Sequence, residues 1–114
     1  MIGSDVIRGY TDTMILFLLL KEPSYGYEIS KNIKLLSDGE YTLKETTLYS
    51  AFGRLEQNGY IESFPGQATG GKRRTYYRIT ESGRAHYREK CREWIQTKKL
   101  IEKFINYNEV EQWT

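Results

Sequence analysis

The sequence predicts a mainly α-helical protein with a small β-hairpin, an α+β fold, that continues into one long helix. Three observations carry this prediction. Four stretches repeat apolar residues at helical spacing. Two short stretches rich in aromatic and β-branched residues flank a glycine-rich loop, as in a hairpin. The length of 114 residues fits one domain, and 39% hydrophobic with 28% charged residues is ordinary for a globular chain.

Composition also narrows the class of protein. The longest apolar run, Met14 to Leu20, is far shorter than the roughly 20 residues that a membrane-spanning helix needs. We find no basic-then-apolar leader at the amino terminus and therefore expect a cytoplasmic protein without a membrane partner. The single cysteine, Cys91, can form neither an internal disulfide nor a cysteine-cluster metal site, which fits a reducing compartment.

The first helix is predicted from Asp5 to Leu20, and its continuously apolar second half should be buried on most sides. Pro23 ends it, because proline disfavours helical geometry in the residue before it. Ser24 is then expected to cap a second helix that runs to the turn signal before Gly39. The predicted buried stripe of that helix is Tyr25, Ile29, Ile33 and Leu36.

The third helix should begin at a capping box formed by Thr42 and Glu45, and Gly59 should close it. Its predicted core face is Leu48, Ala51, Phe52 and Leu55. The opposite face carries small hydroxyls, a tyrosine, a glycine and an arginine, where a solvated face would be rich in Glu and Lys. These residues are Thr46, Thr47, Tyr49, Ser50, Gly53, Arg54 and Gln57. Such a face suits close approach to another surface.

Two strands are predicted next, from Tyr60 to Phe64 and from Thr75 to Thr80. The loop between them contains three glycines and ends in Lys72, Arg73 and Arg74. Net charge, at +2, argues little, and a basic run alone fits a solvated face equally well. A basic hairpin directly after a helix-turn-helix pattern, however, is a wing: its cations would reach phosphates or a minor groove while the third helix enters the major groove.

The last segment predicts a helix from Glu81 to about Asn108, capped by Thr80 and about 40 Å long at 1.5 Å per residue. Its apolar positions recur at alternating steps of four and three, with one polar interruption. The stripe is Tyr87, Cys91, Trp94, Lys98, Ile101 and Ile105. A helix that outreaches its small domain must pack against something else, and the simplest partner is the same helix of a second copy.

Several of these segments, in this order and spacing, resemble the PadR family of bacterial transcriptional regulators. They are Tyr25–Ile29, Thr47–Tyr49, Arg54–Glu56, Gly59–Ile61, Gly70–Tyr77 and Arg78–Gly83. The resemblance spans about Ile7 to Phe104. The short carboxyl-terminal region is similar to the compact branch that includes the multidrug-binding regulator LmrR.

The resemblance implies a homodimer that binds an inverted-repeat operator in double-stranded DNA, usually as a repressor, and we expect no cofactor and no metal. The implied organisation is a winged helix-turn-helix DNA-binding domain at 1–80, a dimerisation helix at 81–108 and a tail at 109–114. The first helix would join the dimer interface. Trp113 in the tail could still dock.

The resemblance also implies where DNA binds. On the third helix, the implied contacts are Lys44, Thr46, Thr47, Tyr49 and Ser50, with Arg54 either contacting phosphate or bracing the helix. In the wing they are Lys72, Arg73 and Arg74. Tyr25 and Tyr27 could touch phosphate through their hydroxyls, but core packing is the alternative and is favoured for Tyr25, which lies on the apolar stripe.

Trp94 matches the position at which the multidrug branch holds a flat aromatic ligand between two symmetry-related aromatic residues. A channel for a small planar aromatic effector would then be lined by Val6, Ile7, Tyr10, Tyr87 and Ile95. Trp94 could equally pack in a closed interface, because interfaces favour tryptophan for its area. Lys98 could face an acidic partner, an anionic ligand or water.

Two other classes of function fit the sequence less well than DNA binding. An enzyme is disfavoured because His86 and Cys91, five residues apart on a helix, differ by about 140° in direction and do not suit a nucleophile–base pair. A winged-helix module that binds protein and not DNA is possible on fold alone. It should show an apolar patch, and not a cationic wing beside a hydroxyl-rich helix.

Overall fold

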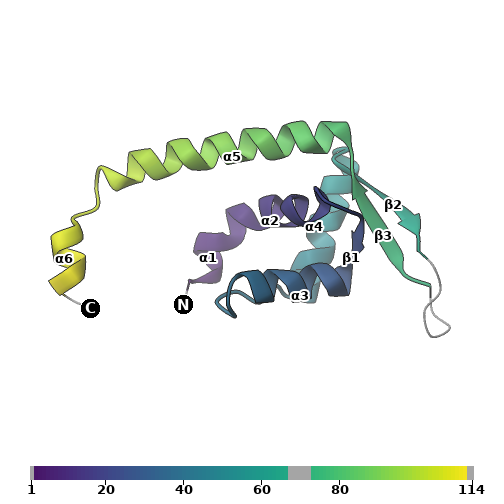
Figure 1. Ribbon diagram of the computed structural model, residues 1–114, viewed down its shortest axis with the longest axis horizontal. Helices are drawn as coiled ribbons and strands as arrows, with labels where there is room; N and C mark the ends of the chain where they lie inside the picture. Colours follow the sequence, from purple (N-terminus) through teal and green to yellow (C-terminus); the bar gives the residue numbers. More distant parts are fainter. Residues whose placement is uncertain (1, 67–72, 113–114) are drawn as a thin grey trace.

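The structure is a computed structural model that describes residues 2–66 and 73–112. Five helices and three strands form most of the chain, with a 3₁₀ turn near the start and a short helix near the end (Figure 1). In chain order they are α1 (Ser4–Ile7), η1 (Arg8–Tyr10), α2 (Thr11–Leu19), β1 (Ser24–Tyr25), α3 (Gly26–Leu36), α4 (Glu45–Gln57), β2 (Ile61–Pro65), β3 (Thr75–Ile79), α5 (Glu81–Glu102) and α6 (Tyr107–Gln112). Within the described residues, no helix is long and apolar enough to cross a membrane.

The predicted first helix is divided into three parts, α1, the 3₁₀ turn η1 and α2. Gly9 lies in the middle of η1, where its backbone freedom weakens a regular helix. α2 supplies Ile15, Leu16 and Leu19 to the core, as expected. Phe17, in contrast, is 50% exposed, so the second half of this segment is not buried on most sides in the single chain.

The helix α3 starts one residue later than expected, and the predicted cap at Ser24 is wrong, because the N-cap residue is Tyr25. Ser24 lies in the short strand β1, and its hydroxyl donates to the carboxylate of Glu28 and does not cap the backbone. Ile29 and Ile33 are buried as predicted. Leu36 is 65% exposed, because it lies in the last turn of α3 where the helix extends past the core.

The core face of α4 is confirmed, since its four predicted residues are at most 2% exposed: Leu48, Ala51, Phe52 and Leu55. The predicted capping box is wrong. The N-cap residue is Lys44, two residues after Thr42, and the buried Leu43 holds the chain extended until that point. Gly59, at φ 76°, ends the segment in the left-handed conformation that was expected.

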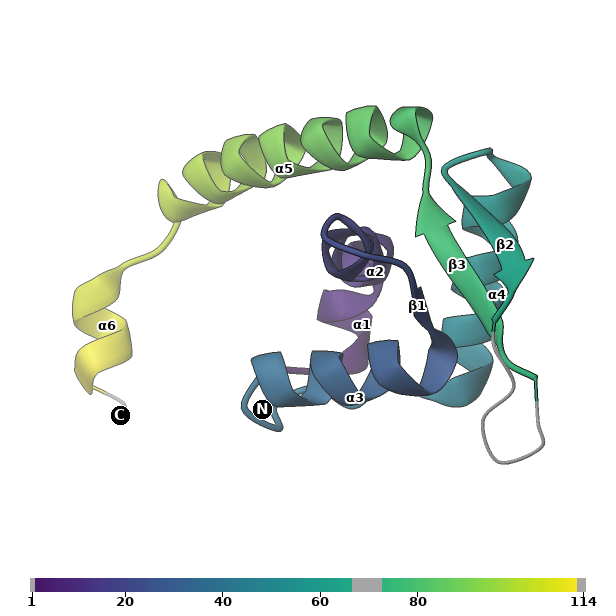
Figure 2. The same cartoon turned by 45° about the vertical axis from the view of Figure 1, so that its right-hand side comes forward.

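The hairpin of β2 and β3 is confirmed, with Ile61 opposite Ile79 and Pro65 opposite Thr75. The strand β1, which the sequence did not reveal, pairs with the other edge of β3, so that β3 lies in the middle of a three-stranded antiparallel sheet (Figure 2). Phe52 of α4 stacks on Tyr77 of β3, with ring centroids 4.0 Å apart. This contact joins the helical layer to the sheet.

The helix α5 begins at the predicted cap: the Thr80 hydroxyl accepts a hydrogen bond from the Gly83 amide at 3.0 Å. Its first turns are fixed to the domain by Arg84, which donates to the Leu20 carbonyl at 2.8 Å, and by His86, which stacks on Tyr60 at 4.0 Å. From there α5 runs along the long axis of a molecule measuring 56 × 29 × 22 Å (Figure 1).

The carboxyl-terminal part departs from the prediction. α5 ends at Glu102, six residues before the expected end at Asn108, and the short helix α6 occupies most of the segment that was expected to be an irregular tail. Asn106 caps α6, because its side-chain oxygen accepts hydrogen bonds from the amides of Asn108 and Glu109. Trp113 lies outside the described residues.

Candidate nucleic-acid interface

The outer face of α4 is built by the same spacing that builds the core. Since four apolar side chains point inward, the residues between them must point to solvent. All six residues predicted to contact DNA from this helix region are exposed: Lys44, Thr46, Thr47, Tyr49, Ser50 and Arg54. The structure therefore brings them together on one surface, with small hydroxyl side chains at its centre.

Arg54 is held at one edge of this surface by Asp12 of α2. Its Nε and one terminal nitrogen donate to the two carboxylate oxygens at 3.2 and 2.6 Å. The hydrogen bond to Asp12 raises the pKa of the Arg54 guanidinium above its ordinary value. Of the two roles left open for Arg54, the structure thus contains the bracing contact, which fixes α4 against α2.

A groove of about 330 Å³ lies at the opposite edge, between α4, the start of α3 and the base of the wing. Its lining includes four tyrosines and two arginines: Tyr25, Tyr27, Tyr49, Tyr77, Arg73 and Arg74. The Arg74 guanidinium lies 4.4 Å from the centre of the Tyr25 ring. The structure therefore places the two described wing arginines beside α4, while Lys72 falls outside the described residues.

The two tyrosines at the start of α3 differ in their surroundings. Tyr25 is half-buried and packs against Tyr76 at 5.2 Å between ring centroids, which agrees with a packing role. Tyr27 is 70% exposed and is free to meet a ligand. A Cβ at Gly26, between them, would lie 2.8 Å from the Tyr49 hydroxyl, so a larger residue there would displace the Tyr49 ring.

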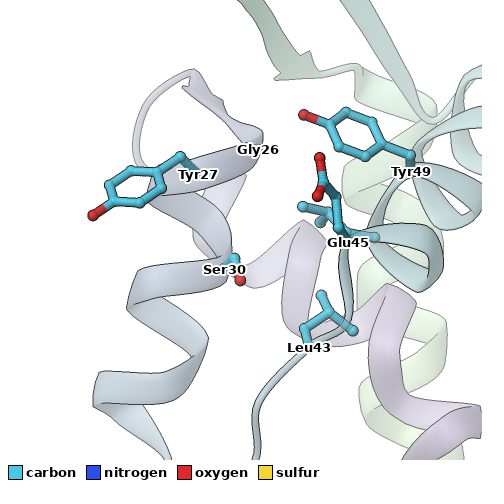
Figure 3. Close-up of a pocket in the computed structure, with 7 residues that line it drawn as sticks. Gly26, Tyr27, Ser30, Leu43, Glu45 and Tyr49 are labelled. Atoms are coloured by element: carbon cyan, nitrogen blue, oxygen red, sulfur yellow. The ribbon is translucent and has the colours of Figure 1, made fainter.

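A second hollow, of about 250 Å³, separates α3 from α4 (Figure 3). Tyr49 leans over the Glu45 carboxylate in this hollow, whereas the ring of Tyr27 points away from it. Sequence reasoning missed Glu45 as a surface residue because it assigned the side chain to a capping box. A carboxylate at the start of such a helix repels phosphate, but it can accept a hydrogen bond from the amino group of cytosine.

The long helix α5 carries a second candidate surface. Trp94 is 47% exposed and meets Tyr10 edge to face at 5.4 Å, so two residues predicted to line one channel do lie together. Exposed apolar side chains continue on both sides of this pair: Val6, Ile95, Leu100, Ile101, Phe104 and Ile105.

Tyr87 lies nearer the domain, beside Phe17 at 6.5 Å between ring centroids. Burial, with a smaller contribution from a hydrogen bond to Cys91, raises the pKa of the Tyr87 phenol. Tyr87 also lines an apolar hollow of about 380 Å³, together with Thr13, Met14, Phe17, Leu18, Ile33, Leu36 and Ser37. This part of the predicted stripe faces the domain and only its distal part is fully open.

Comparison with known proteins gives a consistent result. The model of the transcriptional regulator PadR-like family matches residues 15–89. The chain is 62% identical to a transcriptional regulator from Clostridium thermocellum, with a TM-score of 0.85 over 90% of this chain and 100% of that one. It is 36% identical to a PadR family regulator from Clostridium difficile, with a TM-score of 0.73 over 86% and 100% of the two chains.

A further relative is an uncharacterised protein from Lysinibacillus sphaericus, 43% identical over 105 residues that span 92% of this chain and 96% of that protein. The matched family region contains α3, α4, the sheet and the start of α5, which are the elements that build the candidate interface. This chain therefore belongs to the PadR-like family of transcriptional regulators, whose members regulate transcription and are not enzymes.

Proposed function

We propose that the protein is a homodimeric repressor that binds an inverted-repeat operator through α4 and the wing. The observation that carries the proposal is the juxtaposition of an exposed hydroxyl-rich helix face with Arg73, Arg74 and Tyr27 along one groove. An α-helix fits the major groove of B-DNA, whose width is about 12 Å. Repression is the usual mode of the family that the sequence resembles.

In this proposal the contacts divide into two kinds. Thr46, Ser50 and Tyr49 face the base edges, and Glu45 accepts from a cytosine amino group. The wing cations and the Tyr27 hydroxyl bind backbone phosphates, which position the protein without reading sequence. Lys72 is assigned to the wing contacts on the sequence pattern alone.

The dimer is proposed on the exposed apolar stripe of α5, because Ile101 on this helix and Phe104 just after its end are not covered within one chain. In the proposed dimer, the same helix of a second copy covers this stripe, and DNA binding requires the two α4 helices to lie on one face of the assembly. They must lie about one DNA turn apart, 34 to 36 Å, to enter successive major grooves.

Control by a ligand is a further part of the proposal, in line with the similarity to the LmrR branch. A small planar aromatic compound would insert beside Trp94 and Tyr10 at the dimer centre and change the separation of the two α4 helices. Val6, Ile7 and Ile95 would line this site, with Lys98 at its edge. The half-exposed Trp94 ring supports the proposal.

The ligand site can be tested by fluorescence in a Trp113→Phe background, which leaves Trp94 as the only emitter of the two tryptophans in the sequence. Proflavine, added without DNA, should quench Trp94 emission and bind more weakly after Tyr10→Ala. Emission that does not respond to proflavine or to other planar aromatic compounds would remove the effector channel from the proposal.

DNA binding is tested by fluorescence anisotropy with a labelled fragment from upstream of the protein's own gene and a scrambled fragment, each at two salt concentrations. We expect tighter binding to the upstream fragment, strong salt dependence, and weaker binding by Lys72→Ala/Arg73→Ala. Arg88→Ala, an exposed arginine on α5, is the matched control. Equal or absent binding to both fragments would favour the alternative, a winged-helix module that binds protein.

A further inference from the structure

Two adjoining hollows lie between the start of α2 and the first half of α4, on the side of α4 away from the wing. One has a volume of about 260 Å³ and is lined by Arg8, Thr11, Thr46, Thr47, Ser50 and Arg54. The other, of about 140 Å³, is lined by Arg8, Thr11, Tyr41, Thr42, Lys44 and Thr47. Arg8, Thr11 and Thr47 therefore belong to both, and hydroxyls and cations dominate the lining.

The position of these hollows follows from helix geometry. Successive residues of an α-helix differ in direction by about 100°. Thr47 and Tyr49 are two residues apart, so their directions differ by about 200° and they point to opposite flanks of α4. Tyr49 faces the groove with the wing arginines, and Thr47 faces Arg8. The hydroxyl-rich centre of the helix face lies between these two flanks.

The amino terminus of α4 opens beside the hollows and is not capped by a side chain. Its N-cap residue is Lys44, whose ammonium group can donate but cannot accept a hydrogen bond. The first backbone bond of the helix runs from the Leu48 amide to the Lys44 carbonyl. The amides that precede Leu48 point out of the helix end, where they favour an anion.

Thr11 provides an independent sign of a ligand. It is 2% exposed, and its hydroxyl is the one buried side-chain polar atom without a hydrogen-bond partner within residues 2–66 and 73–112. Buried hydroxyls are nearly always hydrogen-bonded in native proteins. Since Thr11 lines both hollows, a polar group that enters them, or a water molecule held by it, would supply the partner.

The carboxylates of Asp5, Asp12 and Glu45 do not prevent Arg8 from binding an anion. Asp5 contacts Arg8 at 2.9 Å, but the two side chains are 89% and 74% exposed, and such ion pairs are weak in water. Asp12 is engaged by Arg54 at 2.6 Å. Glu45 lines the hollow that contains Tyr27 and lines neither of the two hollows that contain Arg8.

We propose that Arg8, Lys44 and the first-turn amides of α4 bind a DNA backbone phosphate on the strand across the major groove from the wing contacts. The proposal rests on the proposed function and deepens it. A helix in the major groove lies between two phosphate backbones. The wing contacts only one of them, whereas cations on both flanks of α4 would contact both and fix the position of the helix in the groove. The 3₁₀ turn η1 presents Arg8 at the required place.

The first test is the salt dependence of binding to the upstream fragment. Each phosphate contact contributes about 0.9 to the slope of log K against log salt, so Arg8→Ala in a dimer should lower the slope by about 1.8. Affinity should fall at least tenfold at low salt. Arg88→Ala should leave both the slope and the affinity unchanged. Arg73→Ala measures the contribution of the wing to the same two quantities.

The second test locates the contact with duplexes that carry single methylphosphonate substitutions, which remove the charge of one phosphate. At the phosphate that Arg8 contacts, the substitution should lower the affinity of the parent protein for the duplex. It should lower the affinity of Arg8→Ala little further. These positions should lie on the strand opposite to those that depend on Arg73.

The outcomes separate the two proposals. If the parent binds the duplex but Arg8→Ala behaves like Arg88→Ala, the second phosphate site is wrong and DNA binding by the wing stands. If the positions that depend on Arg8 lie on the strand that the wing contacts, the placement across the groove is wrong. If the parent binds no duplex, the proposed function fails and this site fails with it.

Discussion

Gly83 has no Cβ, and this determines how closely the first turn of α5 can pack on the rest of the domain. A Cβ at this position would lie 2.0 Å from the Tyr60 carbonyl oxygen and 2.8 Å from Ile79 Cγ1. Real contacts of that length do not occur, and a backbone carbonyl cannot rotate away as a long side chain can. The first turn of α5 therefore packs directly on the backbone that follows α4.

We expect Gly83→Ala to lower the free energy of unfolding by about 3 kcal/mol, because α5 must shift away from Tyr60. Urea denaturation followed by circular dichroism measures the change. Gly53→Ala is the matched control: a Cβ there meets nothing within 4 Å, so it should stabilise α4 by about 0.5–1 kcal/mol. Equal effects of the two substitutions would show that α5 does not dock on Tyr60 as described.

The unpartnered hydroxyl of Thr11 leads to a second prediction at the residue scale. Thr11→Val keeps the volume and removes the buried oxygen, so it should raise the free energy of unfolding of the free protein by about 1 kcal/mol. Thr11→Ser, which keeps the hydroxyl and removes a methyl group, should lower it. A loss of stability in Thr11→Val, measured by urea denaturation, would mean that the hydroxyl has a partner in the folded protein.

At the scale of elements, α4 is positioned both by its core face and by an ion pair at its outer edge. Leu48, Ala51 and Phe52 fix which face of the helix points inward. Arg54 and Asp12, 42 residues apart in the sequence, link α4 to α2 on the surface. Because Arg8 lies in η1, directly before α2, the pair holds two candidate DNA-binding elements together.

A double-mutant cycle with Asp12→Asn and Arg54→Gln should give a coupling free energy of about 0.5–1 kcal/mol, since both groups are partly exposed and the contact uses two nitrogens. The pair of Glu62 and Arg78, which has a longer contact of 3.5 Å and a more exposed carboxylate, serves as the control and should have a coupling free energy close to zero. Urea denaturation of the single and double variants gives both values. A coupling no larger than that of the control pair would leave α4 positioned by its core face alone.

At the scale of the whole molecule, α5 gives the chain its elongated shape. Its base is fixed by Arg84 and His86, while beyond Trp94 its apolar side chains have little of the domain to pack against. A monomer would leave this stripe in water. The proposed dimer removes that cost and sets the spacing of the two DNA-binding domains at the same time.

Ile101→Asp should therefore shift the protein from dimer to monomer at micromolar concentration, measured by analytical ultracentrifugation, and weaken operator binding with it. Gln96→Asp adds the same charge to the opposite face of α5 and should leave the dimer intact. A parent protein that sediments as a monomer at this concentration, or a dimer that tolerates Ile101→Asp, would contradict the proposed interface.

Sequence alone determined the features that depend on neighbouring residues. The spacing of Leu48, Phe52 and Leu55 predicts the buried face of α4, and that face in turn places the hydroxyls on the outside. The same holds for the strands around the wing, the Thr80 cap and the left-handed Gly59. Such features follow from residue types and spacings within one short segment, or within two segments joined by a single loop, which the order of amino acids specifies directly.

Only the tertiary structure decided the features that depend on distant parts of the chain. Strand β1 exists because β3 offers an edge to pair with, and the start of α4 shifts to Lys44 because Leu43 is drawn into the core. The contacts of Arg54 with Asp12 and of Trp94 with Tyr10 join segments that no local pattern connects. The same is true of the hollow that Arg8 lines together with residues of α4. Packing sets these contacts because the free energy of burying a residue depends on which distant surface covers it.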